Sequence, residues 1–92
     1  MKRISRRDKL KIYGDLLSAL NDQSKTEKTV LTRVQTRINV PFDRLKQYIS
    51  DLVDLGLIEN SISFELTEKG KQYLLEYERV LEFMRNMGLT YQ

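Results

Sequence analysis

The feature that most constrains this chain is Pro41, which separates two patterns of apolar residues with helical spacing. Proline has a fixed φ and no amide proton, so it is tolerated where a helix begins and not inside one. The pattern before it recurs at spacings of three and four, as on one helix face, through Leu31, Val34 and Ile38. A second helix must therefore start near Pro41, directly after a turn around Asn39 and Val40.

The helix after Pro41 carries a longer inner stripe, formed by Leu45, Tyr48, Ile49, Leu52 and Leu55. Gly56 can take the left-handed conformation that ends a helix, which would let Leu57 fold back onto Leu52. Tyr48 lies at the edge of the stripe and is interpreted as a partly buried core residue. Two helices joined by a turn of a few residues have helix-turn-helix spacing, in which the outer face of the second helix stands free.

One further helix is expected before this pair. The first runs from Arg6 to Leu20, with Ser5 as N-cap and Asp8 in its first turn. Its apolar face consists of Leu10, Tyr13, Leu17 and Leu20, widened by Ile12 and Leu16. Thr26 is expected to cap the short second helix.

Beyond Gly56 the apolar period changes from about 3.6 to 2, which predicts a short β-hairpin. Its second strand would alternate through Ile62, Phe64 and Leu66. Thr67 then caps a helix from Glu68 to about Met87. The predicted fold class is mainly α, with some β: a winged helix-turn-helix of three helices, a hairpin wing and a long C-terminal helix. Residues 1–67 would form the body and residues 68–92 a dimerisation helix, within one compact domain.

Two segments also resemble a known family. "TRVQTRINVPFDRLKQYISDLVDLGLIE" followed by "FELTEKGKQYLLEYERVL" is similar to the small archaeal winged-helix family of chromatin proteins and transcriptional regulators. The resemblance implies DNA binding and an antiparallel coiled-coil dimer through the C-terminal helix. The chain departs from the family in two places. Pro41 replaces a small polar cap, and the wing carries Glu59 and Glu65 without any Lys or Arg.

Charge is divided unequally along the 92 residues. Residues 1–46 hold 12 Lys and Arg against 5 Asp and Glu, a balance of +7, and residues 47–92 hold 4 against 8, a balance of −4. Such segregation indicates that one half meets a polyanion, although a merely solvated N-terminus remains the alternative.

Candidate DNA-binding residues follow from the helix-turn-helix reading. Arg44 and Gln47 are types that pair with guanine and adenine in the major groove, and Lys46 and Ser50 would lie nearer the phosphates. Ordinary surface roles are the alternative for all four. Cations that could contact the DNA backbone lie on the second helix and at the N-terminus: Arg33, Arg37, Lys25, Lys28, Lys2, Arg3, Arg6, Arg7, Lys9 and Lys11.

An apolar stripe on the last helix extends beyond what a small winged-helix core needs. This stripe would be exposed in a monomer, so it favours a homodimer in which two such helices pair in antiparallel orientation. Folding back onto the chain's own core is the alternative. The predicted homodimer residues are Leu74, Tyr77, Val80, Leu81, Phe83, Met84 and Met87.

Catalysis is not expected, because the sequence contains no His and no Cys and its four glycines form no phosphate-binding loop. No metal, cofactor or small-molecule substrate is predicted. The basic N-terminus leads into no apolar core of a signal peptide, and no apolar run approaches the roughly 18 residues of a membrane span, so a cytoplasmic, nucleoid-associated protein is expected. The leading hypothesis is a dimeric binder of double-stranded DNA, either a transcriptional regulator or a chromatin-architectural protein. The alternative is a winged-helix protein interaction module that binds no DNA.

Overall fold

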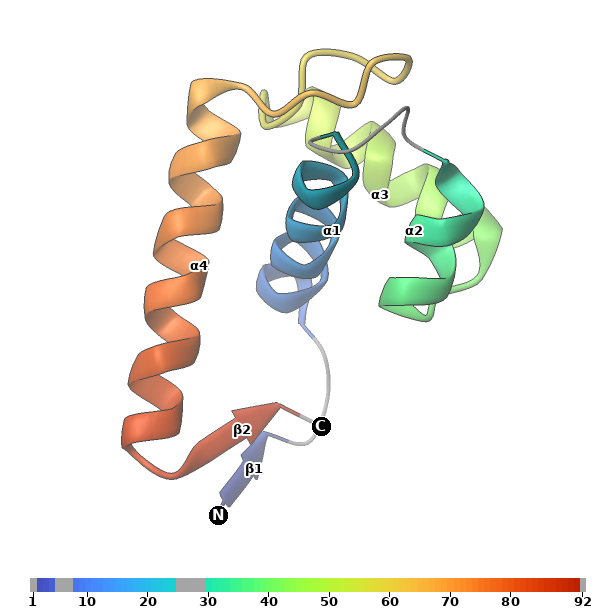
Figure 1. The fold of residues 1–92 in the computed structure, drawn as a ribbon. Helices are drawn as coiled ribbons and strands as arrows, with labels where there is room; N and C mark the ends of the chain where they lie inside the picture. Colours follow the sequence, from blue (N-terminus) through green and yellow to red (C-terminus); the bar gives the residue numbers. More distant parts are fainter. Residues whose placement is uncertain (1, 5–7, 25–29, 92) are drawn as a thin grey trace.

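A computed structural model shows a mainly helical molecule and describes residues 2–4, 8–24 and 30–91 (Figure 1). The elements within these ranges are, in chain order, β1 (Lys2–Ile4), α1 (Lys9–Ser24), α2 (Leu31–Ile38), α3 (Phe42–Asp54), α4 (Glu68–Asn86) and β2 (Leu89–Tyr91). The predicted caps Ser5 and Thr26 and the cations Arg6, Arg7, Lys25 and Lys28 lie outside the described residues.

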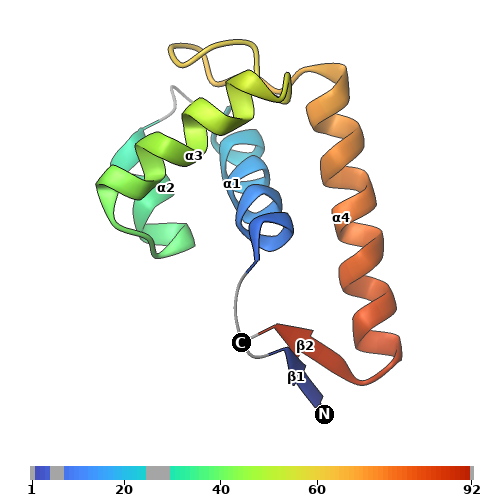
Figure 2. The same ribbon diagram turned by 180° about the vertical axis from the view of Figure 1, so that it is seen from behind.

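Helix α1 is the centre of the fold. It lies between α4 on one side and α2 with α3 on the other, as the two opposite views show (Figures 1 and 2). Helix α3 crosses α1 and α2 and presents its outer side to solvent. The largest fully buried side chains come from α1, α2, α3 and the wing that follows α3: Leu16, Leu17, Leu20, Val34, Leu45, Leu52 and Ile58.

The predicted start of the first helix was wrong by three residues. Helix α1 begins at Lys9, and the carboxylate of Asp8 accepts a hydrogen bond from the backbone N–H of Lys11 at 3.0 Å. Asp8 thus acts as the cap that Ser5 was expected to provide, because a short acidic side chain reaches the free amides of a first turn. The helix also extends to Ser24. Leu10, predicted to be core, is 40% exposed.

The turn before Pro41 is confirmed. Asn39 adopts a left-handed conformation with φ 56°, and its N–H donates to the carbonyl of Gln35 at 2.8 Å, which ends α2. Asparagine tolerates this region because its short polar side chain bonds locally. Pro41 occupies the N-cap position of α3, where its missing N–H costs no helical hydrogen bond.

The predicted end of α3 is also confirmed. Gly56 has φ 76°, its N–H donates to Val53, and the N–H of Leu57 donates to the carbonyl of Leu52 at 2.8 Å. This pair of bonds is a Schellman motif, which turns the chain so that Leu57 is buried. Leu55 is 45% exposed, so its assignment to the inner stripe was wrong. As the last residue before the turn, it lies past the packed part of the helix.

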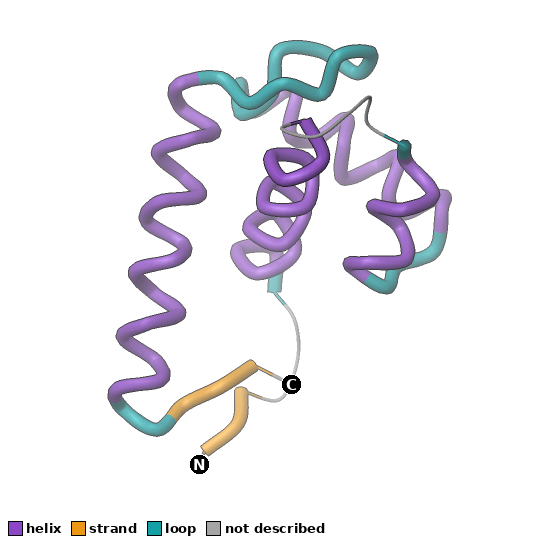
Figure 3. The backbone as a smooth tube through the Cα atoms, viewed as in Figure 1, coloured by secondary structure: helices purple, strands orange, loops and turns teal. Residues whose placement is uncertain are grey.

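The wing is less regular than predicted (Figure 3). A single antiparallel bridge joins Ile58 and Leu66, and no strand forms between them. The side chain of Asn60 accepts hydrogen bonds from the N–H groups of Ile62 and Ser63, both at 2.8 Å, and so replaces a ladder with a tight turn. Phe64 packs inward at φ 58°, whereas Ile62 is 86% exposed. The predicted alternation therefore fails at Ile62.

Helix α4 begins as predicted. The hydroxyl of Thr67 accepts from the N–H of Gly70 at 3.0 Å and donates to the carbonyl of Gly56 at 2.6 Å. The helix ends at Asn86, after which Gly88, at φ 77°, reverses the chain. Strand β2 then pairs in parallel with β1, a sheet that the sequence patterns did not predict.

Candidate nucleic-acid interface

The outer face of α3 is the exposed surface that the helix-turn-helix leaves free. Leu45, Ile49 and Leu52 point into the core, and at 100° per residue Gln47 stands almost opposite them. The predicted site residues Arg44, Lys46, Gln47 and Ser50 are all exposed on this helix. The structure therefore brings all four onto one accessible face.

Two of these residues are cations without an ion-pair partner in the described part of the chain. Arg44 and Lys46 lie on either side of Gln47, and neither forms an ion pair with any residue of the described ranges. An unpaired cation can contact a phosphate without first breaking an existing ion pair.

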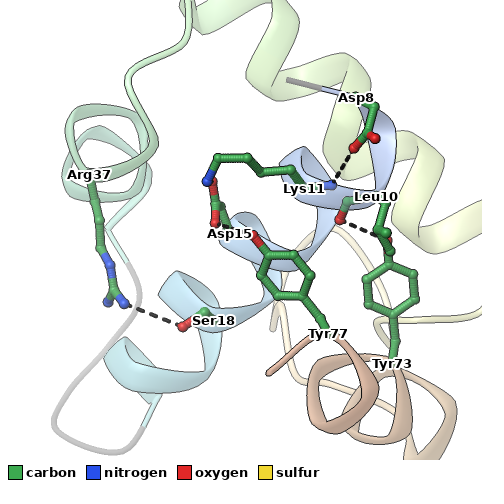
Figure 4. Close-up of polar contacts among 8 residues, drawn as sticks. All are labelled: Asp8, Leu10, Lys11, Asp15, Ser18, Arg37, Tyr73 and Tyr77. Carbon is green, nitrogen blue, oxygen red and sulfur yellow. Dashed lines mark hydrogen bonds and ion pairs between the residues drawn. The ribbon is translucent and has the colours of Figure 1, made fainter. Parts of the chain in front are cut away.

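Arg37 of α2 is engaged with α1. Arg37 makes an ion pair of 2.8 Å with Asp22 of α1. It also donates to the hydroxyl of Ser18 on the same helix at 3.4 Å (Figure 4). A phosphate contact by Arg37 would have to compete with these bonds. Arg33 is exposed on the same helix.

A chain of hydrogen bonds links α1 to the centre of the outer face of α3. The hydroxyl of Tyr13 donates to Oδ2 of Asp51 at 2.7 Å, and Nε2 of Gln47 donates to Oδ1 of the same carboxylate at 3.0 Å. Tyr13 is only 7% exposed, and its ring meets Tyr48 edge to face at 6.2 Å. The partly buried position expected for Tyr48 is confirmed. The surface carboxamide of Gln47 is thus tied to a core residue of another helix.

The contacts of Tyr13 and Asp51 shift the pKa values of both side chains. Burial, followed by the bond to Asp51, raises the pKa of Tyr13 to about 12. Donation by Tyr13, and then by Gln47, lowers the pKa of Asp51, and nearby Lys9 acts in the same direction. At neutral pH Tyr13 is therefore a donor and Asp51 an ionised acceptor.

A shallow groove of about 380 Å³ runs between α3 and the wing. Its walls are mainly apolar, with Lys46, Ser50 and Asp54 along the α3 rim and Ser61 on the wing. The wing itself presents exposed Glu59 and Glu65. A groove with so few cations does not resemble a phosphate-binding channel.

The N-terminal cations divide between two places. Lys2 and Arg3 lie in β1, beside β2 at the end of α4, whereas the wing lies at the other end of α4 (Figures 1 and 2). Lys9 and Lys11 lie in the first turns of α1, where Nζ of Lys11 pairs with Asp15 at 2.8 Å. Of these described residues, Lys9 lies near Asp51 of α3, whereas the backbone of Lys2 and Arg3 lies at the end of α4 away from the wing.

Helix α4 is fastened to α1 by two tyrosines (Figure 4). The hydroxyl of Tyr77 donates to Oδ1 of Asp15 at 2.9 Å, and that of Tyr73 donates to the carbonyl of Leu10 at 3.0 Å. A side chain at Gly14 would overlap the ring of Tyr77, so glycine permits the close approach.

The predicted apolar stripe of α4 was partly misassigned. Leu74, Tyr77 and Met84, three of the predicted homodimer residues, are buried within the chain. Helix α4 packs against α1 and against β2, the strand that follows the reversal at Gly88. Val80 and Leu81 are half-buried, whereas Phe83 and Met87 are each 60% exposed.

The sequence patterns gave Asp51 no role in the site. The spacing of Gln47 and Asp51, four residues apart, is a signal for a side-chain pair on a helix. Nothing local indicates Tyr13 as the third member, because that residue is 38 positions earlier in the chain.

Comparison with known proteins places these observations in a family. A family model described as a winged helix-turn-helix matches residues 6–85 of the 92. No curated protein and no solved structure gives a match. Within the described residues, no helix has the length and apolar character needed to cross a membrane, and no group of three or more acidic residues is arranged to hold a metal ion.

Proposed function

The chain belongs to the winged helix-turn-helix family, whose domains generally bind DNA, and on this premise we propose that it binds double-stranded DNA with α3 in the major groove. The observation that carries the proposal is the outer face of α3, where the unpaired cations Arg44 and Lys46 flank Gln47. This face is accessible along its whole length, as a helix that enters a groove requires.

Each residue has a distinct part in this proposal. Arg44 and Gln47 would read base edges, since arginine pairs with guanine and glutamine with adenine. Lys46, Ser50 and Arg33 would contact the backbone and set the position of the helix. The acidic wing would remain outside the minor groove, because Glu59 and Glu65 are repelled by phosphate.

The test is a fluorescence-anisotropy titration of a labelled mixed-sequence duplex at several salt concentrations. Binding should weaken steeply with salt, because each phosphate contact contributes about 0.9 to the slope of log K against log salt concentration. Weak binding with a slope near zero would contradict the proposal. It would favour the protein interaction module, for which α3 is suited by its excess of Asp43, Asp51 and Asp54 over two cations.

We extend the proposal to a homodimer formed through α4. Phe83 and Met87 are four residues apart on one exposed face, and an apolar groove of about 300 Å³ adjoins α4 near Val80. Glu76 and Arg79 precede Phe83 on the same helix and form an ion pair of 3.0 Å. Charges of both signs along α4 would suit an antiparallel partner helix.

The oligomeric state tests this extension. Light scattering after size exclusion should give a dimer for the unchanged chain and a monomer for Phe83→Glu. Ile62→Glu is a matched control, because it places the same charge at an exposed apolar residue of the wing. A dimer that survives Phe83→Glu would contradict the assignment to α4.

A dimer would also define the binding site on DNA. If both α3 helices enter major grooves on one side of the duplex, the half-sites should be related by a two-fold axis and separated by about one helical turn or a multiple of it. Such a protein would act with the nucleoid, as a transcriptional regulator or as a chromatin-architectural protein. Strong preference for one site would favour regulation, and uniform coverage would favour packaging.

A further inference from the structure

The carboxamide of Gln47 is held in one orientation at the centre of the exposed face. Its Nε2 donates to Asp51, and within the described part of the chain it makes no other side-chain hydrogen bond. An ionised carboxylate only accepts hydrogen bonds, so Gln47 must present its N–H side to Asp51. The amide therefore does not exchange its oxygen and nitrogen freely, as an unattached glutamine would.

The bond to Asp51 differs from an ordinary pair on a helix surface because a third residue fixes the carboxylate. Tyr13 belongs to α1, its ring is buried, and its hydroxyl holds Oδ2 at 2.7 Å. The position of Asp51 is thus set by packing in the core. An exposed pair four residues apart would otherwise lose much of its order to side-chain motion.

The orientation leaves a particular pattern outside the protein. With one N–H engaged, Gln47 still offers Oε1 as an acceptor and its second N–H as a donor. Adenine presents the complement in the major groove, namely the N6 amino group as donor and N7 as acceptor. Thymine, guanine and cytosine do not present this pair on one base.

We propose that Tyr13 and Asp51 are positioning residues that orient Gln47 to select an adenine at one position of the bound duplex. The inference rests on the proposed function, since it requires α3 to lie in the major groove. This series of hydrogen bonds from Tyr13 through Asp51 to Gln47, which we call the relay, adds selectivity at one base pair. It adds little to overall affinity, because neither Tyr13 nor Asp51 contributes a cation.

The experiment has two stages and uses the full chain. Selection from a random duplex library first defines the preferred site, and competition anisotropy then compares that site with variants changed at single base pairs. We expect one A·T pair whose replacement weakens binding by about tenfold, within the range of a good bidentate contact. We call the Kd for the changed site divided by the Kd for the preferred site the selectivity ratio at that base pair. Gln47→Ala should reduce this ratio to near one without unfolding the protein, because the side chain is exposed.

Two substitutions then test the relay itself. Tyr13→Phe should lower the ratio at that pair at least threefold and leave the ratios at other pairs unchanged. Asp51→Asn should also lower it, but should raise affinity for random duplex, since it removes a negative charge from the DNA-facing side. A structural defect alone would lower both the ratio at the A·T pair and the affinity for random duplex. Tyr77→Phe is the matched control, because it deletes an equivalent hydroxyl on the other side of α1.

The experiment distinguishes a failure of the proposed function from a failure of the relay. If the unchanged chain shows no salt-dependent duplex binding, the proposed function is wrong. If it binds duplex without selectivity at any A·T pair, or if Tyr13→Phe retains the full ratio, the relay is overturned while DNA binding stands.

Discussion

Helix α1 carries the same chemical pair on its two sides, with opposite consequences. Towards α4, the hydroxyl of Tyr77 binds Asp15 at 2.9 Å, and towards α3, the hydroxyl of Tyr13 binds Asp51 at 2.7 Å. We call the first the inner pair and the second the outer pair. Each joins two helices through a buried tyrosine and a carboxylate.

The two pairs differ in the further partner that each carboxylate binds. Asp15 of the inner pair is also held by Lys11 on its own helix, and the ring of Tyr77 rests on Gly14, so every contact closes within the molecule. Asp51 of the outer pair passes its second oxygen to the exposed Gln47. The comparison teaches that one bond type can either complete a core or carry the order of a core to a surface.

The largest effect on the inner pair is expected from a side chain added at Gly14, beneath the ring of Tyr77. Gly14→Ala should destabilise the fold by about 3 kcal/mol or more, because the new Cβ overlaps the ring of Tyr77 and the packed helices cannot separate cheaply. Urea unfolding measures this. Gly88→Ala is the control, since a Cβ there meets open space and only the left-handed backbone is strained, at about 1 kcal/mol. Equal losses would contradict the close approach.

Alkaline pH isolates the outer pair. Because the folded-state pKa of Tyr13 is about 12, above its unfolded value, its contribution is fully present below pH 10 and is lost as pH rises to 12. The loss is at most roughly 3 kcal/mol at about 1.4 kcal/mol per unit. Unfolding curves across this range should fall less steeply for Tyr13→Phe than for the unchanged chain. Parallel curves would show that Tyr13 is not perturbed.

Deleting each hydroxyl compares the two pairs directly. Tyr77→Phe should cost about 2 kcal/mol, as expected for a part-buried hydrogen bond to a charged group. Tyr13→Phe should cost about 1 kcal/mol, because the half-exposed Asp51 can bind water instead. Thermal unfolding of the two variants gives the ranking. The reverse order would mean that the outer pair is the main structural contact.

A similarly small effect is expected at Thr67, where the chain passes from α3 to α4. Thr67 caps α4 and donates to Gly56 at the end of α3, so Thr67→Ala should cost about 1 kcal/mol. Thr67→Ser retains the hydroxyl and should recover most of that loss in the same chemical unfolding assay. If serine does not restore stability, the methyl group rather than the cap is responsible.

Much of this fold follows from local signals. Pro41, Gly56 and Thr67 fix helix ends because each has one suitable backbone role, and the sequence predicted all three boundaries. The cations of α3 were likewise predictable, since the spacing of the buried stripe determines which residues remain outside.

The errors arose where distant segments meet. The cover over Leu74, Tyr77 and Met84 depends on α1 and the reversal at Gly88, and no periodicity within α4 reveals it. The outer pair joins residues 38 positions apart, so its carboxylate looked like any solvated aspartate. In the wing, the side chain of Asn60 competes with strand pairing, which alternation alone does not show.

The most direct test of the account is charge reversal on α3. Arg44→Glu combined with Lys46→Glu should abolish most duplex binding and reduce the magnitude of the salt slope by about 2 per chain, with the oligomeric state unchanged. Lys71→Glu, an exposed reversal at the start of α4, should have little effect. Duplex binding that survives the double reversal with its salt slope intact would show that α3 is not the DNA-binding surface.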